Sequence, residues 1–124
     1  MENNFRGVIP ELPVNDVAKT LDYYRDVLGY DVLGYKIEGR HEDIFGSVLR
    51  GKANIYFRKF DGSITPNRCY VCVDEVDELC RFFKANGATI IEEPENKPWG
   101  YRQFTLEDIN GHLFYYFRFA DGVE

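Results

Sequence analysis

Hydrophobic residues between positions 17 and 28 recur at spacings of four, three and four, which predicts a helix with one apolar face. The residues on that face are Val17, Leu21, Tyr24 and Leu28. Asp16 stands ahead of them as an N-cap, and Gly29 follows where a helix would end. Residues 7–14 alternate in polarity and residues 30–37 are strand-like in composition. The pattern therefore predicts a strand, a helix and a second strand.

The second half of the chain repeats this order. Residues 68–73 predict a strand, and Asp74 or Glu75 caps the helix that follows. Its buried face consists of Val76, Leu79 or Cys80, and Phe83. A hairpin follows each strand–helix–strand unit, with Asn110-Gly111 as a strong turn signal in the second. The predicted remaining strands are 88–93 in the second unit, then 43–49 with 53–59 and 101–107 with 112–119 in the two hairpins.

The two halves share this pattern at a fixed offset. Residues 14–17 (Val-Asn-Asp-Val) return as residues 73–76 (Val-Asp-Glu-Val), which lie 73 − 14 = 59 positions later. The same offset pairs Phe45 with Phe104. Twice 59 is 118, nearly the whole of the 124 residues, so an ungapped duplication is the simplest interpretation. Two long copies favour a pseudo-twofold domain over a stacked repeat.

We therefore expect an α+β fold in which two tandem βαβββ modules form curved mixed sheets around a cleft, with the helices on the outer faces. Module 1 spans about 5–60, a connector spans 61–67, and module 2 spans about 68–120. The proline-flanked segment 94–100 predicts a rigid, polar loop inside module 2. A chain of 124 residues can bury one core, so residues 1–124 are predicted to form a single domain.

Charge and composition narrow the possible functions. The net charge is −6 and the basic residues are scattered, which disfavours nucleic acid as a partner. No apolar run has the length of a signal peptide or a membrane helix, so we expect a cytoplasmic protein without membrane contact. The three cysteines fit a reducing compartment. Cys69 and Cys72 would point to opposite faces of a strand, which favours free thiols over a metal or redox pair.

Aromatic residues make up 16% of the chain, which is high enough to suggest a lined cavity, although filling two small cores would also use them. We expect the helix-covered faces to hold the core. Its predicted members are Leu21, Tyr24, Leu28, Val76 and Phe83 from the helices, with Phe45, Phe104 and Leu106 from the strands. Residues 113–119 are apolar at nearly every position, so this last strand is predicted to be buried on both faces.

Three local motifs extend the pattern: Asn15-Asp16-Val17 with Tyr23-Tyr24 at the helix entry, Trp99-Gly100 ahead of a strand, and the turn 108–111. Together with two βαβββ units, these motifs resemble the vicinal oxygen chelate superfamily over nearly the whole chain. That superfamily includes glyoxalase I, extradiol dioxygenases and the bleomycin resistance proteins, and the likeness is strongest to the last of these. The usual Asp-Pro-Asp-Gly turn appears here as Asp-Ile-Asn-Gly, without the proline.

In the enzymes of this superfamily, four strand positions hold a divalent metal. The resemblance places those positions at Ile9, Tyr56, Arg68 and Tyr115. None suits a metal, because a catalytic site needs about three imidazole, carboxylate or thiolate ligands. Glu11 is two residues from the first position but would stand alone. His41 is expected in a solvated loop with Glu42 and Asp43, and His112 should face away from the cleft. We therefore expect no metal and no cofactor.

Strand alternation instead predicts an aromatic groove with polar tips. Its predicted residues are Ile9, Glu11, Tyr56, Arg58, Arg68, Tyr70, Tyr115 and Phe117. The resemblance adds Trp99, which could stack on a ligand or anchor its own loop. This set has no catalytic residue, and we hypothesise a metal-free protein that binds and sequesters a small aromatic or cationic compound, of the antibiotic resistance type. The resemblance also implies a homodimer whose subunits both complete the groove.

Two alternatives stay open. One is a metal-dependent lyase, isomerase or dioxygenase of the same superfamily with noncanonical ligands, or one that uses Glu11, Tyr56, Tyr115 and Arg68 for acid–base chemistry. The other is a regulatory or immunity-type protein that uses the scaffold as an interaction surface. The sequence does not identify the ligand, because the fold alone does not determine function.

Overall fold

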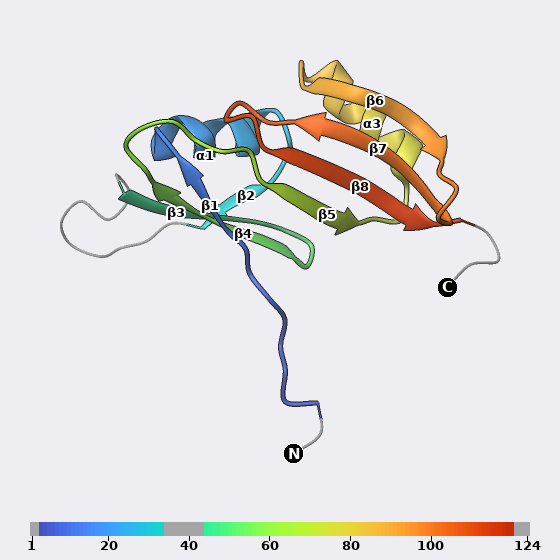
Figure 1. The fold of residues 1–124 in the computed structure, drawn as a ribbon, viewed down its shortest axis with the longest axis horizontal. Coiled ribbons are helices and arrows are strands. Elements are labelled where there is room, and N and C mark those ends of the chain that lie inside the picture. The colour runs from blue at the N-terminus through green and yellow to red at the C-terminus, as the bar shows by residue number, and fades with distance from the viewer. Residues whose placement is uncertain (1–2, 34–43, 121–124) are drawn as a thin grey trace.

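The computed structural model describes residues 3–33 and 44–120. Module 1 contains β1 (Glu11–Val14), α1 (Val17–Asp26), β2 (Asp31–Leu33), β3 (Phe45–Arg50) and β4 (Ala53–Lys59). Module 2 contains β5 (Arg68–Cys72), α3 (Val76–Ala85), β6 (Thr89–Asn96), β7 (Tyr101–Glu107) and β8 (Leu113–Phe119). Figure 1 shows the two modules side by side, each with one helix packed against its sheet. The predicted α+β architecture of two tandem modules is confirmed.

Both modules have the same sheet topology. The strand orders are β1-β4-β3-β2 and β5-β8-β7-β6, so β1 and β5 occupy equivalent edges. The first strand of each module runs parallel to the last, β1 to β4 and β5 to β8, and the other neighbours are antiparallel. The two sheets stay separate and do not close into a barrel.

The 59-residue repeat holds in the helices and in the parallel strand pairs. Helix α3 starts 76 − 17 = 59 and ends 85 − 26 = 59 positions after α1. Glu11 lies opposite Tyr56, and the same register returns as Tyr70 opposite Tyr115. Asp16 caps α1 as predicted, with its carboxylate accepting a hydrogen bond from the Lys19 N–H at 2.9 Å.

The prediction of an ungapped duplication is wrong at the β7–β8 hairpin. Phe45 lies opposite Arg58, but Phe104 lies opposite Tyr116 instead of Phe117, so Gln103 is the counterpart of Phe45. The first hairpin closes around residues 51–52, whereas the second closes around residues 109–111, where the Asp108 N–H donates to the His112 carbonyl. One extra residue in the second turn therefore shifts β7 by one position along β8, relative to the pairing of β3 with β4.

This shift corrects the predicted role of Phe45. Its side chain is buried but lies outside the main hydrophobic cluster, with its ring edge-on to Tyr56 at 5.0 Å. Because Phe45 pairs with Arg58 and alternation is strict, it faces away from α1, and Gly46 takes the position beneath the helix. The prediction that Phe45 packs under a helix was therefore wrong, whereas Phe104 and Leu106 lie in the core as expected.

Segment 94–100 is also not wholly a loop. Strand β6 extends through Pro94 to Asn96, and only 97–100 form the connection. Pro94 is tolerated because β6 is an edge strand, where a missing N–H need not break a ladder bond. The register shifts between Ile90 and Glu92 and again between Glu92 and Glu95, as expected of an edge strand that accommodates proline.

The core is shared by the two modules. The ring centroid of Tyr24 in α1 lies 4.8 Å from that of Phe57 and 6.1 Å from that of Phe114, so Tyr24 contacts both sheets. The hydroxyls of Tyr30 and Tyr116 lie 3.0 Å apart, joining module 1 to module 2. Strand β8 is buried on its helix side but only partly on the other, so the prediction of burial on both faces holds only in part.

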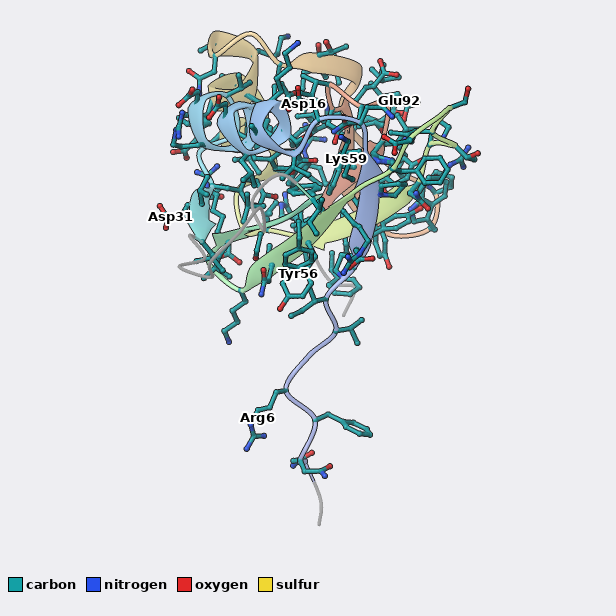
Figure 2. The ribbon with its side chains drawn as sticks, turned by 90° about the vertical axis from the view of Figure 1, so that its left-hand side faces the viewer. Arg6, Asp16, Asp31, Tyr56, Lys59 and Glu92 are labelled. Carbon is teal, nitrogen blue, oxygen red and sulfur yellow. The ribbon has the colours of Figure 1, made fainter. Side chains whose placement is uncertain are left out.

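The N-terminal segment is shorter as a strand than predicted. Strand β1 begins at Glu11, and residues 3–9 extend away from the body as an arm, with Arg6 far from both sheets (Figures 1 and 2). Phe5 and Val8 are 91% and 93% exposed on this arm. Residues 34–43, which include His41 and the end of the predicted 30–37 strand, lie outside the described residues. In the described part of the chain, no helix is long and apolar enough to cross a membrane.

Candidate functional site

Each sheet has one face toward the helices and one face away from them, and six of the predicted site residues lie on the faces away from the helices. In module 1 this face carries Glu11, Tyr56 and Arg58 on neighbouring strands. The Arg58 Nε donates to Glu11 Oε1 at 3.0 Å, and its guanidinium lies 5.2 Å from the Phe45 ring centroid. The hydrogen bond to Glu11 raises the pKa of Arg58. We call this surface the module 1 face.

The corresponding surface of module 2, the module 2 face, is aromatic. Tyr70 stacks on Tyr115 with ring centroids 4.7 Å apart, and Tyr101 stacks on Phe117 at 4.2 Å. Phe119 continues the row, edge-on to Tyr101 at 5.4 Å. Tyr70 is 58% and Phe119 is 40% exposed, so the row offers ring surface to solvent. Such a surface suits flat or amphipathic ligands.

A polar group borders the aromatic row at β6. The Lys97 ammonium donates to Glu95 Oε1 at 2.6 Å and to Glu92 Oε1 at 3.4 Å. Glu92 Oε1 also accepts from the Thr105 hydroxyl at 3.0 Å. The hydrogen bond to Glu95 is the main cause of the raised pKa of Lys97, so this ammonium stays charged. Trp99 lies beside it, with the ammonium 5.8 Å from the indole ring centroid.

The structure brings the predicted residues together in two groups, one per module. Glu11, Tyr56 and Arg58 share the module 1 face, and Tyr70, Tyr115 and Phe117 share the module 2 face. Tyr56 and Glu92, one from each module, lie well apart in Figure 2. The Arg58–Glu11 hydrogen bond and the Phe45–Tyr56 contact join residues of module 1, and the Tyr70–Tyr115 and Tyr101–Phe117 stacks join residues of module 2.

The other two predicted residues lie at the borders of module 2. Arg68 is the first residue of β5, opposite Leu113, and Trp99 lies in the β6–β7 connection with 55% of its surface exposed. The sequence reasoning missed Tyr101 and Phe119, although Tyr101 lies opposite Phe119 in the predicted hairpin and Phe119 has the same parity as Phe117. That alternation was the signal that could have found them.

The residues at the four positions that hold a metal in the enzymes of the superfamily are not suited to bind a metal ion in this chain. Ile9 precedes β1, and Tyr115 is stacked on Tyr70. Arg68 is cationic, and Glu11, the nearest carboxylate, is already paired with Arg58. Residues 3–33 and 44–120 contain no group of three or more His, Cys, Asp or Glu side chains placed to hold a metal. His112 is fully buried away from these faces, with Nδ1 accepting from the Asn67 N–H at 2.9 Å.

A separate hollow among the described residues lies away from both faces. It has a volume of about 830 Å³ and lies between α3, the open edge of β5 and the β3–β4 turn. Tyr30 and Tyr116 line it, and Tyr70 is the one predicted site residue at its border. Its walls carry charges of both signs, from Arg50 and Lys52 on one side and from Asp74, Glu75 and Glu78 on the other.

Comparison with known proteins agrees with this architecture. The family model described as "Glyoxalase/Bleomycin resistance protein/Dioxygenase superfamily" matches residues 69–116, most of module 2. No curated protein gives a significant match. The resemblance recognised in the sequence is confirmed by the family match and by the solved structures below.

Three solved structures are similar over almost the full chain. TioX from Micromonospora sp. ML1 is 25% identical, with a TM-score of 0.80, and the match covers 93% of this chain and 99% of TioX. TnmS3, an antibiotic binding protein from Streptomyces sp. CB03234, is 25% identical, with a TM-score of 0.74 and coverages of 94% and 98%. The bleomycin-binding protein from Streptomyces verticillus, complexed with copper(II)-bleomycin, is 20% identical, with a TM-score of 0.74 and coverages of 91% and 95%. This last likeness shows the fold alone.

Proposed function

We propose that this chain is a member of the glyoxalase/bleomycin resistance protein/dioxygenase superfamily, and that it binds and sequesters a small aromatic or cationic compound without a metal and without turnover. The observation that carries the proposal is the aromatic row of the module 2 face, with stacked pairs at 4.7 and 4.2 Å and no group of metal-ligating side chains among the described residues there. The similarity to TnmS3, an antibiotic binding protein, supports an antibiotic as the ligand.

The chemistry of the face explains why binding is favoured over reaction. Stacked phenyl and phenol rings supply broad contact area at little conformational cost, and the carboxylates of Glu92 and Glu95 at the border attract cations. The net charge of −6 adds a weak, long-range attraction for cations. Acid–base catalysis needs a titratable group positioned against the reacting atom, and Glu11, the carboxylate of the module 1 face, is held by Arg58.

We further propose that a second copy of the chain completes the site. Each face is open on its own, and in one chain the two faces lie apart (Figure 2). A twofold dimer would place Glu11, Tyr56 and Arg58 of one copy over the aromatic row of the other, which buries exposed rings such as Tyr70. Sedimentation equilibrium tests this directly, and a monomer at micromolar concentration would contradict it.

The binding test uses metal-free bleomycin as the probe and titration calorimetry as the measurement. Tyr115→Ala removes one member of the Tyr70 stack, and we expect it to weaken binding by about three- to tenfold, the value of one aromatic contact. Phe82→Ala is the matched control, because Phe82 is 41% exposed and lines the hollow instead. Equal weakening by both variants, or weakening by Phe82→Ala alone, would move the site to the hollow.

Metal content tests the remaining part of the proposal. We expect the purified protein to hold no stoichiometric transition metal and its thermal midpoint to be unchanged by chelator. A stoichiometric zinc, nickel or iron ion whose removal lowers the midpoint would favour an enzyme of the superfamily instead. Absence of binding by bleomycin and by the aromatic probes used below would refute the sequestration role itself.

A further inference from the structure

The Lys97 side chain is folded back onto the module 2 face. Its ammonium bonds both Glu95 and Glu92, at 2.6 and 3.4 Å, although Glu92 lies five positions earlier in the chain. The side chain is only 10% exposed, which is unusual for a lysine next to a turn. Its ammonium also lies near the Trp99 ring, at 5.8 Å. A cation is therefore held by two carboxylates and an indole beside the aromatic row.

The aliphatic part of the Lys97 side chain, its stem, crosses the sheet at the position of Gln103. Glu95 lies opposite Gln103 and Glu92 lies opposite Thr105, so a side chain that reaches from residue 97 to Glu92 spans the Gln103 position. Gln103 has the same strand parity as Thr105, whose hydroxyl bonds Glu92, and it lies opposite Phe117. It therefore belongs to the module 2 face.

Gln103 carries an unused acceptor at this place. The residue is only 2% exposed, and its Oε1 has no hydrogen-bond partner among residues 3–33 and 44–120. A buried polar atom without a partner is destabilising by about 1–3 kcal/mol, so such atoms are rare and call for an explanation. A ligand N–H that replaces the apolar stem of Lys97 would supply the missing donor.

We propose that Glu92, Glu95, Trp99 and Gln103 form a subsite for the ammonium group of an aromatic amine, and that Lys97 occupies this subsite in the free protein. The proposal rests on the proposed function, because the aromatic part of the same ligand stacks on the row of Tyr101 and Phe117. A ligand amine takes the place of the lysine ammonium between the carboxylates, and its N–H groups reach the Gln103 Oε1.

The free-energy cost of removing the Lys97 ammonium from the subsite is offset when a ligand amine takes its place. The lysine ammonium gains full hydration when it leaves, and its four-carbon stem regains rotamer freedom. The ligand amine takes over charge-assisted hydrogen bonds of the same kind and adds the bond to Gln103. Lys97 thus lowers the apparent affinity by the fraction of time it fills the subsite. A neutral ligand that needs only the aromatic row escapes this competition.

The test compares two naphthalene probes of nearly equal shape, 1-naphthylmethylammonium and 1-naphthylmethanol. Binding is followed by NMR titration of the indole N–H of Trp99, the one tryptophan of the chain. In Lys97→Met, which removes the ammonium bonds that anchor this side chain to Glu92 and Glu95, we expect the ammonium probe to bind about tenfold more tightly than in the unaltered protein and the alcohol to bind unchanged. Adding Glu95→Gln to Lys97→Met should remove the gain.

Lys84→Met is the matched control. Lys84 also pairs with a glutamate of β6, Glu93 at 2.9 Å, but this pair joins α3 to the strand, so neither probe should respond. Unchanged or weaker binding of the ammonium probe in Lys97→Met, with the alcohol still bound, overturns the subsite and leaves the aromatic face intact. Failure of both probes to bind either protein overturns the proposed function as well. Thermal unfolding of each variant shows that the fold is kept.

Discussion

The Tyr24 hydroxyl donates a hydrogen bond of 2.7 Å to Asp108 Oδ2, which joins helix α1 of module 1 to the β7–β8 turn of module 2. Both side chains are buried, and the other carboxylate oxygen of Asp108 accepts from the N–H groups of Asn110 and His112 at 2.9 Å each. The same carboxylate therefore shapes the three-residue turn and fixes it to the neighbouring module.

Tyr24→Phe should destabilise the protein by about 1–3 kcal/mol, because it leaves a buried carboxylate oxygen without its donor. Urea unfolding followed by circular dichroism measures this free energy. Tyr23→Phe is the matched control, since the neighbouring Tyr23 hydroxyl makes no hydrogen bond within the described residues. Equal losses in both variants would show that ring packing, and not the Asp108 bond, is responsible.

Buried phenols should make the fold sensitive to alkali. Burial, together with the charges of Asp108 and Glu107, raises the pKa of Tyr23 to about 12, and burial also raises the pKa values of Tyr24 and Tyr116 well above their usual range. Unfolded phenols ionise near pH 10 while the folded ones keep their protons, so stability is full below about pH 10 and falls as the pH rises toward 12.

Each such phenol should lower the unfolding free energy by about 1.4 kcal/mol per pH unit in that window. Urea midpoints measured from pH 9 to 12, with phenolate absorbance recorded in parallel, test this. In Tyr24→Phe the slope should decrease by the share of one group. Ionisation of all tyrosines near pH 10 with the far-ultraviolet spectrum intact would contradict the burial argument.

The contact between α1 and β3 depends on a glycine. A Cβ at Gly46 would lie 2.9 Å from both methyl carbons of Leu21 and 3.0 Å from Val17 Cγ1, closer than side chains pack. Gly46→Ala should therefore destabilise the protein by about 1–3 kcal/mol through overpacking. Leu21→Ala makes room, so the double variant should lose less than the sum of the two single variants in a urea-unfolding cycle. Strict additivity would exclude the contact.

The sequence predicted the repeat, the helices and the order of the elements along the chain, because hydrophobic period and helix capping are local signals and no insertion separates the two helices from their common offset. It failed where one residue changed register. Phe45 was assigned to the helix side from the offset with Phe104, and the longer second turn reverses that assignment. The sizes of the residues in contact are also reversed between the modules. In module 1 the large Leu21 packs over Gly46, whereas in module 2 the corresponding positions hold the small Cys80 and the large Phe104, both in the core.

The candidate site was recovered in part for the same reason. Alternation placed Tyr70, Tyr115 and Phe117 on one face, where their rings are in contact. It did not reveal that Lys97 folds back over the sheet, since a loop was predicted where β6 continues through Pro94. Long side chains at a strand end reach several residues back, and sequence spacing does not specify that path.

A second link between helix and sheet should give an acid-dependent loss of stability. Arg102 donates from Nη2 to Asp77 Oδ1 at 2.7 Å and from Nε to Oδ2 at 2.8 Å, which ties β7 to α3. These bonds hold the pKa of Asp77 below its usual range. The folded state therefore binds this proton less readily than the unfolded chain, so the stabilisation is present above about pH 4 and is lost as the pH falls through the lowered pKa.

Asp77→Asn should lower the unfolding free energy at neutral pH by no more than about 1 kcal/mol, because the Asp77 side chain is 44% exposed and solvent screens the pair. The stability curves of the variant and the unaltered protein, measured by urea unfolding, should converge as the pH falls through the lowered pKa of Asp77, below which both carry an uncharged group. Asp26→Asn breaks an exposed pair within α1 and should leave the curve unchanged. A constant difference down to the lowest pH would mean that Asp77 acts through packing and not through its charge.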